Sequence, residues 1–158
     1  MTTPYWEEFT QIVLARHPEW ESFVRGAVAG RAPYGLDDER FFIEVPSVHP
    51  TRLEPLVIEV ADREPGGPID TYWGEYFEHN FCWPRGDYHT QIDNVIRRVE
   101  SWISDDWVFG LSFDLASGRR TGWGGYFASE GEPELQEKAD KRYVFWSWLG
   151  THDRGTEG

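Results

Sequence analysis

The apolar residues near the start of the chain recur every three to four positions, the spacing of one helix face. They form two groups separated by His17-Pro18, and Gly30 follows the second group. The groups are Tyr5, Trp6, Phe9, Ile12 and Val13, then Trp20, Phe23, Val24, Ala27 and Val28. Proline is tolerated in the first turn of a helix but interrupts its interior. The pattern therefore predicts an N-terminal pair of short helices, the first ending near Ala15 and the second near Val28.

From residue 41 onward the apolar residues alternate with polar ones, as is typical of strands. Residues 41–45 and 56–60 are rich in β-branched and aromatic side chains, and Pro residues lie between them. The run Glu-Pro-Gly-Gly-Pro at 64–68 is a strong turn signal. A third strand is expected over about 69–81, because Trp83-Pro84 follows it.

Residues 88–104 carry the strongest helical pattern of the chain. Its apolar face consists of Ile92, Val95, Ile96, Val99 and Ile103, and charged residues occupy the opposite face. This amphipathic pattern predicts a helix that packs one face on a sheet and exposes the other to water.

The alternation returns at 107–115, and a turn at 116–120 leads into the glycine-rich segment 121–127. These two segments predict a β-hairpin, and the aromatic run 143–149 predicts a last strand. The short connections favour antiparallel neighbours. The expected fold is therefore α+β: an antiparallel sheet of about six strands, the 88–104 helix across one face, and the N-terminal helical pair. One domain is expected over 1–150, followed by a polar tail over 151–158.

The net charge of the chain indicates which classes of partner it favours. Its 158 residues include 15 Lys and Arg against 28 Asp and Glu, a net charge of −13 with a pI near 4.7. Such a field repels phosphate backbones and anionic lipid surfaces, which disfavours nucleic-acid and membrane binding. It attracts a cationic partner. A solubilising role for the acidic residues is the alternative.

The cysteine count and the N-terminus indicate where the protein resides. The single Cys82 excludes an internal disulfide and a site of several cysteine ligands. The first residues lack the basic and apolar regions of a signal peptide, and no apolar run approaches the roughly 20 residues that span a bilayer. A cytoplasmic protein of bacterial type is the simplest expectation.

The densest polar and aromatic stretch covers residues 72–83. On one extended strand, Glu75 and His79 share a face but lie too far apart for two ligands of one metal ion. His79 with Asp87 and His89, across the following turn, is an easier metal site. The more favoured interpretation is a structural histidine bonded to the backbone or to a carboxylate. Cys82 is disfavoured as a nucleophile, because its side chain points away from His79 and its aromatic neighbours raise the thiol pKa.

The tryptophans and glycines of the strands allow two further interpretations. An aromatic-lined sugar cleft would be built from Trp73, Trp83, Trp123, Trp146 and Trp148. Core packing is the more favoured role for these strand aromatics. The run Gly-Trp-Gly-Gly-Tyr at 122–126 lacks the Lys-Ser/Thr end of a phosphate-binding loop, so its glycines favour a bulge or a close approach of another group.

A protein-binding surface is the remaining signal, because Tyr and Trp serve as interface anchors and a carboxylate rim selects a basic partner. The candidate contact residues are Tyr72, Tyr76, Glu78, Asp105, Asp106, Trp107, Trp123 and Tyr126. Tyr72, Tyr76 and Glu78 are expected on one strand face. The pattern alone does not decide whether these residues lie on an open face or in the core.

The strand ending in His-Asn-Phe, the 88–104 helix and the Gly-Trp-Gly-Gly-Tyr hairpin resemble small bacterial α+β immunity proteins of polymorphic-toxin systems, over about residues 56–127. The resemblance implies a cytoplasmic inhibitor that occludes a toxin, often a cationic nuclease. This function needs no cofactor and is the favoured hypothesis. The alternative is a small enzyme or ligand-binding domain with a polar pocket built from Glu75, His79, Asp87 and His89. The oligomeric state stays open.

Overall fold

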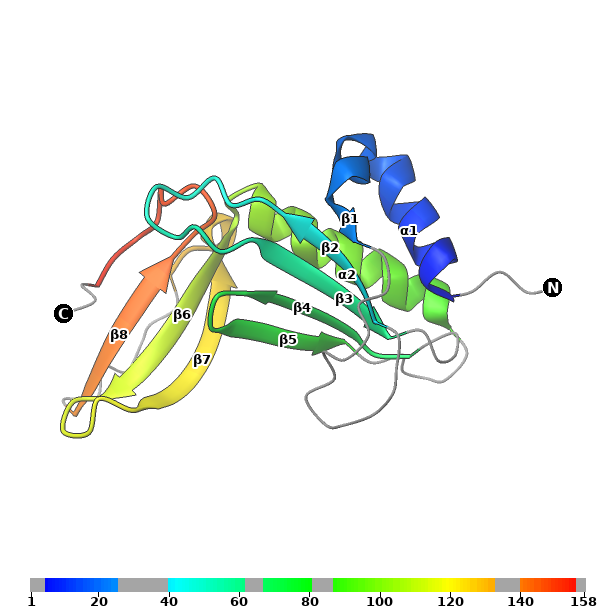
Figure 1. Ribbon diagram of the computed structural model, residues 1–158. Coiled ribbons are helices and arrows are strands. Elements are labelled where there is room, and N and C mark those ends of the chain that lie inside the picture. Colours follow the sequence, from blue (N-terminus) through cyan, green and yellow to red (C-terminus); the bar gives the residue numbers. More distant parts are fainter. Residues whose placement is uncertain (1–4, 26–39, 62–66, 81–86, 133–139, 156–158) are drawn as a thin grey trace. The chain divides into compact units, whose positions relative to one another are not determined.

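The computed structural model describes residues 5–25, 40–61, 67–80, 87–132 and 140–155 of the chain (Figure 1). It is an α+β structure with antiparallel sheets and few helices, which confirms the expected fold class. The strands form two sheets, of five and three strands, rather than one sheet of about six. Within the described residues, neither helix combines the length and hydropathy needed to cross a bilayer.

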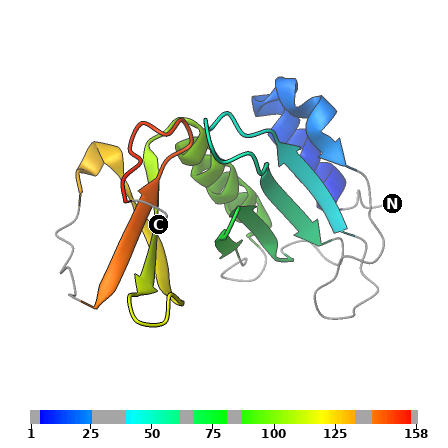
Figure 2. The same ribbon diagram turned by 60° about the vertical axis from the view of Figure 1, so that its left-hand side comes forward.

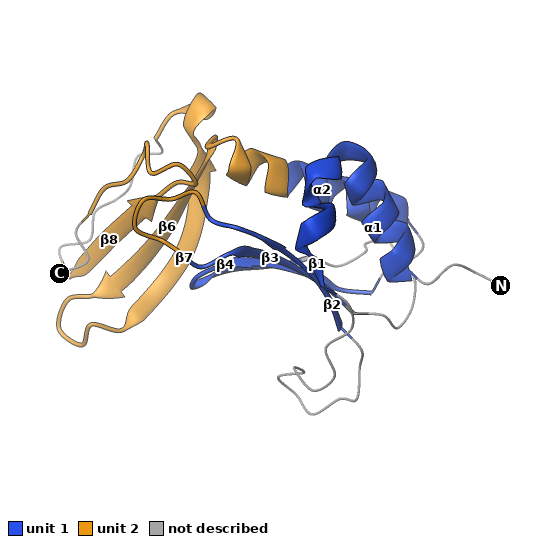
Figure 3. Ribbon diagram, turned by 45° about the horizontal axis from the view of Figure 1, so that its top comes forward, with its two compact units in different colours: residues 1–47, 54–98 blue, residues 48–53, 99–158 orange. Residues whose placement is uncertain are grey.

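The chain divides into two compact units (Figure 3). Unit 1 consists of residues 1–47 and 54–98, and unit 2 of residues 48–53 and 99–158. The boundary between residues 98 and 99 falls inside helix α2 (Tyr88–Ile103). The expectation of one domain over 1–150 stays a prediction, and each unit is described by itself.

Unit 1 holds the N-terminal elements and the larger sheet. Its elements are α1 (Tyr5–Arg16), the 3₁₀ helix η1 (Pro18–Phe23), β1 (Val24–Arg25), β2 (Arg40–Val45), β3 (Leu56–Ala61), β4 (Ile69–Trp73), β5 (Tyr76–Asn80) and most of α2 (Tyr88–Ile103). The strands follow one another in the order β1-β2-β3-β4-β5, each antiparallel to the next.

One face of this sheet forms the core of unit 1. Its buried residues include Phe41 and Ile43 of β2, with Val60 and Ile58 directly opposite on β3. Trp6 of α1 stacks on Phe41 with 3.9 Å between the ring centroids. Figure 2 shows α1 and α2 on the same side of strands β2 and β3. The alternating apolar residues of the strands and the apolar helix faces therefore meet in one layer.

Two local predictions for unit 1 are wrong. The second N-terminal helix is a short 3₁₀ helix over 18–23 that passes into strand β1, because Pro18 suits a first turn and Gly26 and Val24 propagate a helix poorly. The expected strand over 69–81 is a hairpin, since Trp73 pairs with Tyr76 across a two-residue loop. Gly74 takes a φ of 60°, which the loop needs and which other residues rarely adopt.

Helix α2 begins and ends at aspartates. Asp87 caps its start: Oδ1 accepts the backbone N–H of Thr90 at 3.2 Å and Oδ2 accepts the Thr90 hydroxyl at 2.7 Å. These bonds, the hydroxyl first, hold the pKa of the Asp87 carboxyl below its usual value. Asp105 ends the helix in the left-handed conformation, with a φ of 64°. The expected bounds of 88–104 are correct within one residue.

Unit 2 is built on the smaller sheet. Its elements are β6 (Trp107–Asp114), β7 (Arg120–Phe127), the 3₁₀ helix η2 (Ala128–Glu130) and β8 (Lys141–Trp146), in the order β7-β6-β8. Figure 1 shows β6 between its two neighbours. The predicted 107–127 hairpin is confirmed, and the last strand covers 141–146 instead of 143–149.

Aromatic rings fill the core of unit 2. Phe109 lies edge-on to Trp102 at 5.0 Å and stacks on Trp146 at 5.6 Å. Arg52, from the 48–53 segment, places its guanidinium 4.2 Å from the Trp146 ring centroid. The segment 48–53 thus belongs to unit 2 although the chain around it belongs to unit 1.

Candidate binding surfaces

The β4–β5 hairpin divides the residues that were expected on one face. Tyr76 is 1% exposed, and its hydroxyl donates to Glu78 Oε1 at 2.9 Å. Glu78 also forms a two-pronged ion pair with Arg98 of α2, with N–O distances of 2.8 to 3.0 Å. Tyr72 pairs in register with Phe77, on the opposite face. The expectation that Tyr72, Tyr76 and Glu78 share a face is therefore wrong, because the turn at 74–75 reverses the chain.

The face of the hairpin that carries Tyr72 is a strip of four residues, called here the hairpin strip. Asp70 lies opposite His79 and forms an ion pair with it, and Tyr72 lies opposite Phe77 with 6.5 Å between ring centroids. The rings of Phe77 and His79 stack at 5.9 Å. Phe77 is 44% exposed, so its ring is accessible on this face. Sequence reasoning missed Phe77, since the assumed continuous strand gave it no distinct role.

The three residues proposed for a metal site have three different partners. His79 pairs with Asp70, His89 lies 3.7 Å from Glu8, and Asp87 caps α2. The structure does not bring His79, Asp87 and His89 together. Within the described ranges, no group of three His, Cys, Asp or Glu residues is placed to hold a metal ion. Cys82 and Trp83 lie outside the described residues.

The other expected contact residues lie in unit 2, where some are buried in the core and others lie at the surface. Asp105 and Trp107 are 8% and 7% exposed, so they are not surface anchors. The Asp105 carboxylate accepts the backbone N–H of Leu149 at 2.7 Å, which ties the end of α2 to the segment after β8. Asp106 accepts the amide and hydroxyl of Ser129 at 2.9 and 3.1 Å.

Trp123 and Tyr126 are exposed enough for their side chains to contact a partner. Trp123 is 61% exposed on β7, and Tyr126 is half-buried beside Phe145, with 6.1 Å between the ring centroids. The aromatic sugar cleft is not formed by the described tryptophans, because Trp73, Trp146 and Trp148 are at most 4% exposed. Core packing is confirmed for those three residues.

A shallow hollow of about 200 Å³ lies on one face of the three-stranded sheet. Its floor is glycine: Gly110 pairs with Gly124, and Ser112 pairs with Gly122. Aromatic rings form its walls, contributed by Tyr126, Tyr143 and Phe145. The expected close approach of another group to a strand glycine is confirmed at Gly125, where an added Cβ would lie 2.5 Å from the Trp107 ring.

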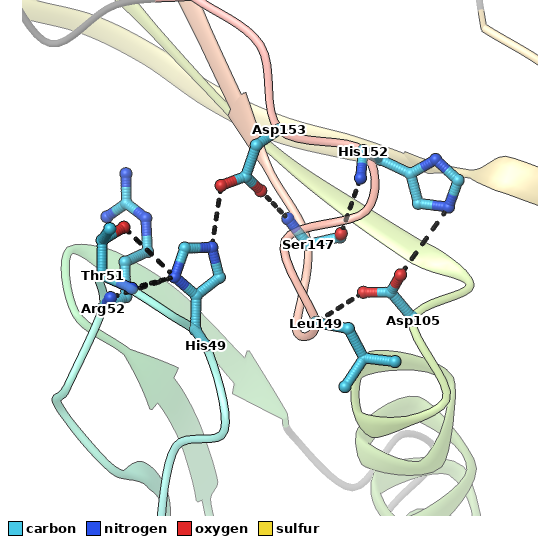
Figure 4. Close-up of polar contacts among 8 residues, drawn as sticks. All are labelled: His49, Thr51, Arg52, Asp105, Ser147, Leu149, His152 and Asp153. Carbon is cyan, nitrogen blue, oxygen red and sulfur yellow. Dashed lines mark hydrogen bonds and ion pairs between the residues drawn. The ribbon is translucent and has the colours of Figure 1, made fainter.

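A polar cluster in unit 2 contains the residue types of a hydrolase triad, the buried Ser147 and His49 and the partly exposed Asp153 (Figure 4). His49 Nε2 donates to Asp153 Oδ2 at 2.8 Å, and His49 Nδ1 accepts the backbone N–H groups of Thr51 and Arg52 at 3.1 and 3.0 Å. The Ser147 hydroxyl oxygen instead accepts the N–H of His152 at 3.1 Å. Both ring nitrogens of His49 are therefore engaged, and neither serves as a base for Ser147.

The role of this cluster is to hold two loops together. Asp153 Oδ1 also accepts the backbone N–H of Ser147 at 3.0 Å, so one carboxylate joins the 48–53 segment to the residues after β8. His79 bonds the Asp70 carboxylate, as the favoured interpretation of that residue expected, and His49 is a second histidine bonded to a carboxylate, which the sequence analysis did not single out. The signal that could have found it is His49-Pro50 between two strands, where a turn needs a buried acceptor for its N–H groups.

Comparison of the chain with models of protein families, with curated proteins and with solved structures found no match.

Proposed function

We propose that the chain is a protein-binding module that uses the hairpin strip of unit 1 to bind a cationic partner. The observation that supports this proposal is that the described arginines of unit 1 are already paired with carboxylates. All five arginines of unit 1 within the described ranges form ion pairs with carboxylates of the same unit: Arg16, Arg25, Arg40, Arg97 and Arg98. These five positive charges are neutralised within the unit, and carboxylates that face the solvent remain.

The charge is concentrated in this unit. The sequence of unit 1 has eight Lys and Arg against seventeen Asp and Glu, whereas unit 2 has seven against eleven. Exposed carboxylates of unit 1 include Glu19, Glu21, Glu54, Glu75 and Asp87. A field of this sign raises the association rate of a basic protein and opposes nucleic acid.

The hairpin strip adds a specific contact to this field. An arginine or lysine of a partner can lie over the exposed Phe77 ring, close in the chain to the exposed Glu75 of the adjoining turn. Aromatic rings beside carboxylates are well suited to a guanidinium group, which stacks and forms ion pairs together. The narrower form of the proposal, suggested by the immunity-protein resemblance, is an inhibitor that occludes a basic toxin.

A direct test measures binding of a fluorescein-labelled peptide of alternating Arg and Gly by fluorescence anisotropy, at about 0.02 M and 0.3 M NaCl. We expect binding at low salt that weakens at high salt, and no binding of the matching Glu-Gly peptide. Phe77→Ser should lower the affinity about two- to fivefold, the value of an exposed cation–π contact. Leu115→Ser, which truncates another exposed apolar residue, is the control.

A second pair of variants distinguishes binding at the hairpin strip from attraction by the overall negative charge of unit 1. Glu75→Lys and Glu21→Lys change the net charge of −13 by the same amount and both alter exposed residues of unit 1. The proposal requires Glu75→Lys to weaken peptide binding more than Glu21→Lys. Equal losses for the two, together with unchanged binding by Phe77→Ser, would show that the strip is not the contact surface.

A further inference from the structure

The hollow on the three-stranded sheet is bordered by aromatic rings that share one face with its glycines. The register places Gly124, Gly110 and Phe145 side by side in one row across β7, β6 and β8. Tyr126 follows Gly124 by two positions on β7, and Tyr143 precedes Phe145 by two positions on β8. Because side chains alternate between the two faces of a strand, these three rings rise from the face on which the hollow lies.

Open space lies over Gly124. A Cβ added there would meet no atom within 4 Å, whereas a Cβ added at Gly110 would lie 3.0 Å from Cε1 of the Phe145 ring. The Phe145 ring therefore covers Gly110 and stands beside the space at Gly124. The rings of Tyr126 and Phe145 meet at an interplanar angle of 66°, with 6.1 Å between their centroids. The two rings form a corner, and each side chain is only half-buried.

A cation over Gly124 would lie close to both rings of this corner. Neighbouring strands are about 4.8 Å apart, which is the spacing from Gly124 to the ring that covers Gly110. Two residues along a strand span about 6.6 Å, which is the spacing from Gly124 to Tyr126. Both values are close to the range of a cation–π contact, about 6 Å from the ring centroid. The corner therefore offers two rings to one cation.

The charge of the protein favours a cation over an anion. The chain has a net charge of −13, and unit 2 has seven Lys and Arg against eleven Asp and Glu. Phe145 already accepts one cation, because the guanidinium of Arg154 lies 4.3 Å from its ring centroid. Arg154 is itself neutralised by an ion pair with Glu132. A field of this sign raises the concentration of cations near the molecule.

The lining of the hollow indicates which kind of cation it suits. It consists of glycine backbone, aromatic rings, Leu111 and Ser112, and none of these described residues carries a charge. A primary ammonium or a guanidinium group brings N–H donors, whose burial without good acceptors costs free energy. A quaternary ammonium group has methyl groups in place of these donors, so it needs no acceptor and contacts the rings directly.

We propose that the corner between Tyr126 and Phe145, with its floor at Gly110 and Gly124, binds a quaternary ammonium group. Choline-type small molecules and the side chain of trimethyllysine share this head group. The volume of about 200 Å³ suits a head group rather than a drug-sized molecule, for which pockets measure about 300–1,000 Å³. This inference does not rest on the hairpin strip, because every residue of the corner belongs to unit 2.

The test compares choline with dimethylbutanol, its neutral isostere, in which a carbon atom replaces the nitrogen. Binding is followed by NMR titration of the full chain, through the amide chemical shifts of Gly110, Gly122 and Gly124. We expect choline to bind in the millimolar range and about five- to thirtyfold more tightly than dimethylbutanol. This ratio is the one that a partly desolvated cation–π contact provides.

Two variants with matched controls connect binding to the corner. Tyr126→Leu keeps an apolar side chain but removes a ring, so the preference for choline over dimethylbutanol should fall at least about threefold. Gly124→Leu fills the hollow, at a position with open space for a side chain, and should abolish binding of both probes. Phe113→Leu removes a ring outside the hollow, and Thr151→Leu adds a leucine at another exposed residue of unit 2. Both controls should bind choline as wild type does.

Equal affinities of wild type for choline and dimethylbutanol would overturn the proposal, as would choline titrations that leave the three glycine amides unchanged. Neither result depends on whether a variant folds. A trimethyllysine peptide and its unmethylated form distinguish the two sources of the head group: a methylated peptide that binds more tightly than choline indicates a protein ligand, and one that does not indicates a small molecule. Phe77→Ser should leave the choline shifts unchanged, so this site and the hairpin strip can fail separately.

Discussion

Removal of the Asp153 carboxylate tests whether the cluster around His49 stabilises unit 2. Asp153→Ala takes away the acceptor of two donors, His49 Nε2–H at 2.8 Å and Ser147 N–H at 3.0 Å. The His49 side chain and Ser147 are both fully buried. A buried donor left without an acceptor costs about 1–3 kcal/mol.

The expected loss in the free energy of unfolding depends on how exposed the carboxylate and its two donors are to water. The Asp153 side chain is 37% exposed, so water can replace part of what the carboxylate supplies. We therefore expect a loss of about 2 kcal/mol in the free energy of unfolding from the two donors together. For a chain of this length that corresponds to a decrease of about 4–8 °C in the melting temperature. Asp153→Asn keeps one acceptor oxygen and should lose about half as much.

Urea denaturation followed by tryptophan fluorescence measures this loss, because Trp102, Trp107, Trp146 and Trp148 all lie in unit 2. Glu130→Ala, which removes an exposed carboxylate of the same unit, should stay within about 0.5 kcal/mol of wild type. In the double variant with His49→Ala, the loss should be smaller than the two single losses added together. An Asp153→Ala protein as stable as Glu130→Ala would refute the assignment of a stabilising role to this carboxylate.

Two further outcomes are expected. Gly125→Ala should lower the free energy of unfolding by about 1–3 kcal/mol in thermal unfolding, because its Cβ would lie 2.5 Å from the Trp107 ring and from the Val108 carbonyl oxygen. Gly124→Ala has open space at its Cβ and should lose far less stability. Equal losses for the two variants would contradict this packing. Asp87 has a lowered pKa in the folded state, so its stabilisation is complete above the unfolded-state pKa and is lost as pH falls through the folded-state pKa. The stability difference between wild type and Asp87→Ala should therefore shrink below about pH 4, and a difference that is constant from pH 7 to pH 3 would show that ionised Asp87 does not cap the helix.

The sequence predicts elements well where one periodicity continues without interruption. Helix α2 and the β6–β7 hairpin appear within one residue of their expected ends. The β4–β5 hairpin was missed because Gly74-Glu75 sits inside a continuous aromatic run with no Asn-Gly or Asp-Gly pair. A Gly-X pair between Trp73 and Tyr76 also serves as a two-residue hairpin loop, so the signal was present.

The candidate surfaces could not be predicted from the local sequence pattern, because they depend on which strands pair and on contacts between distant residues. Tyr76 and Phe77 are adjacent aromatic residues, yet one is 1% and the other 44% exposed, because the pairing of β4 with β5 decides which face each occupies. The bond between His49 and Asp153 joins residues 104 positions apart.

The position of segment 48–53 has a consequence for the biosynthesis of the chain. This segment is translated after about half of unit 1, but its buried His49 finds its carboxylate only at Asp153, 104 positions later. The bond between His49 and Asp153 therefore cannot form until residue 153 has been translated. Loop closure over such a separation is slow compared with hairpin formation, so the aromatic core of unit 2 is exposed to the cell's chaperones and proteases longer than the local hairpins.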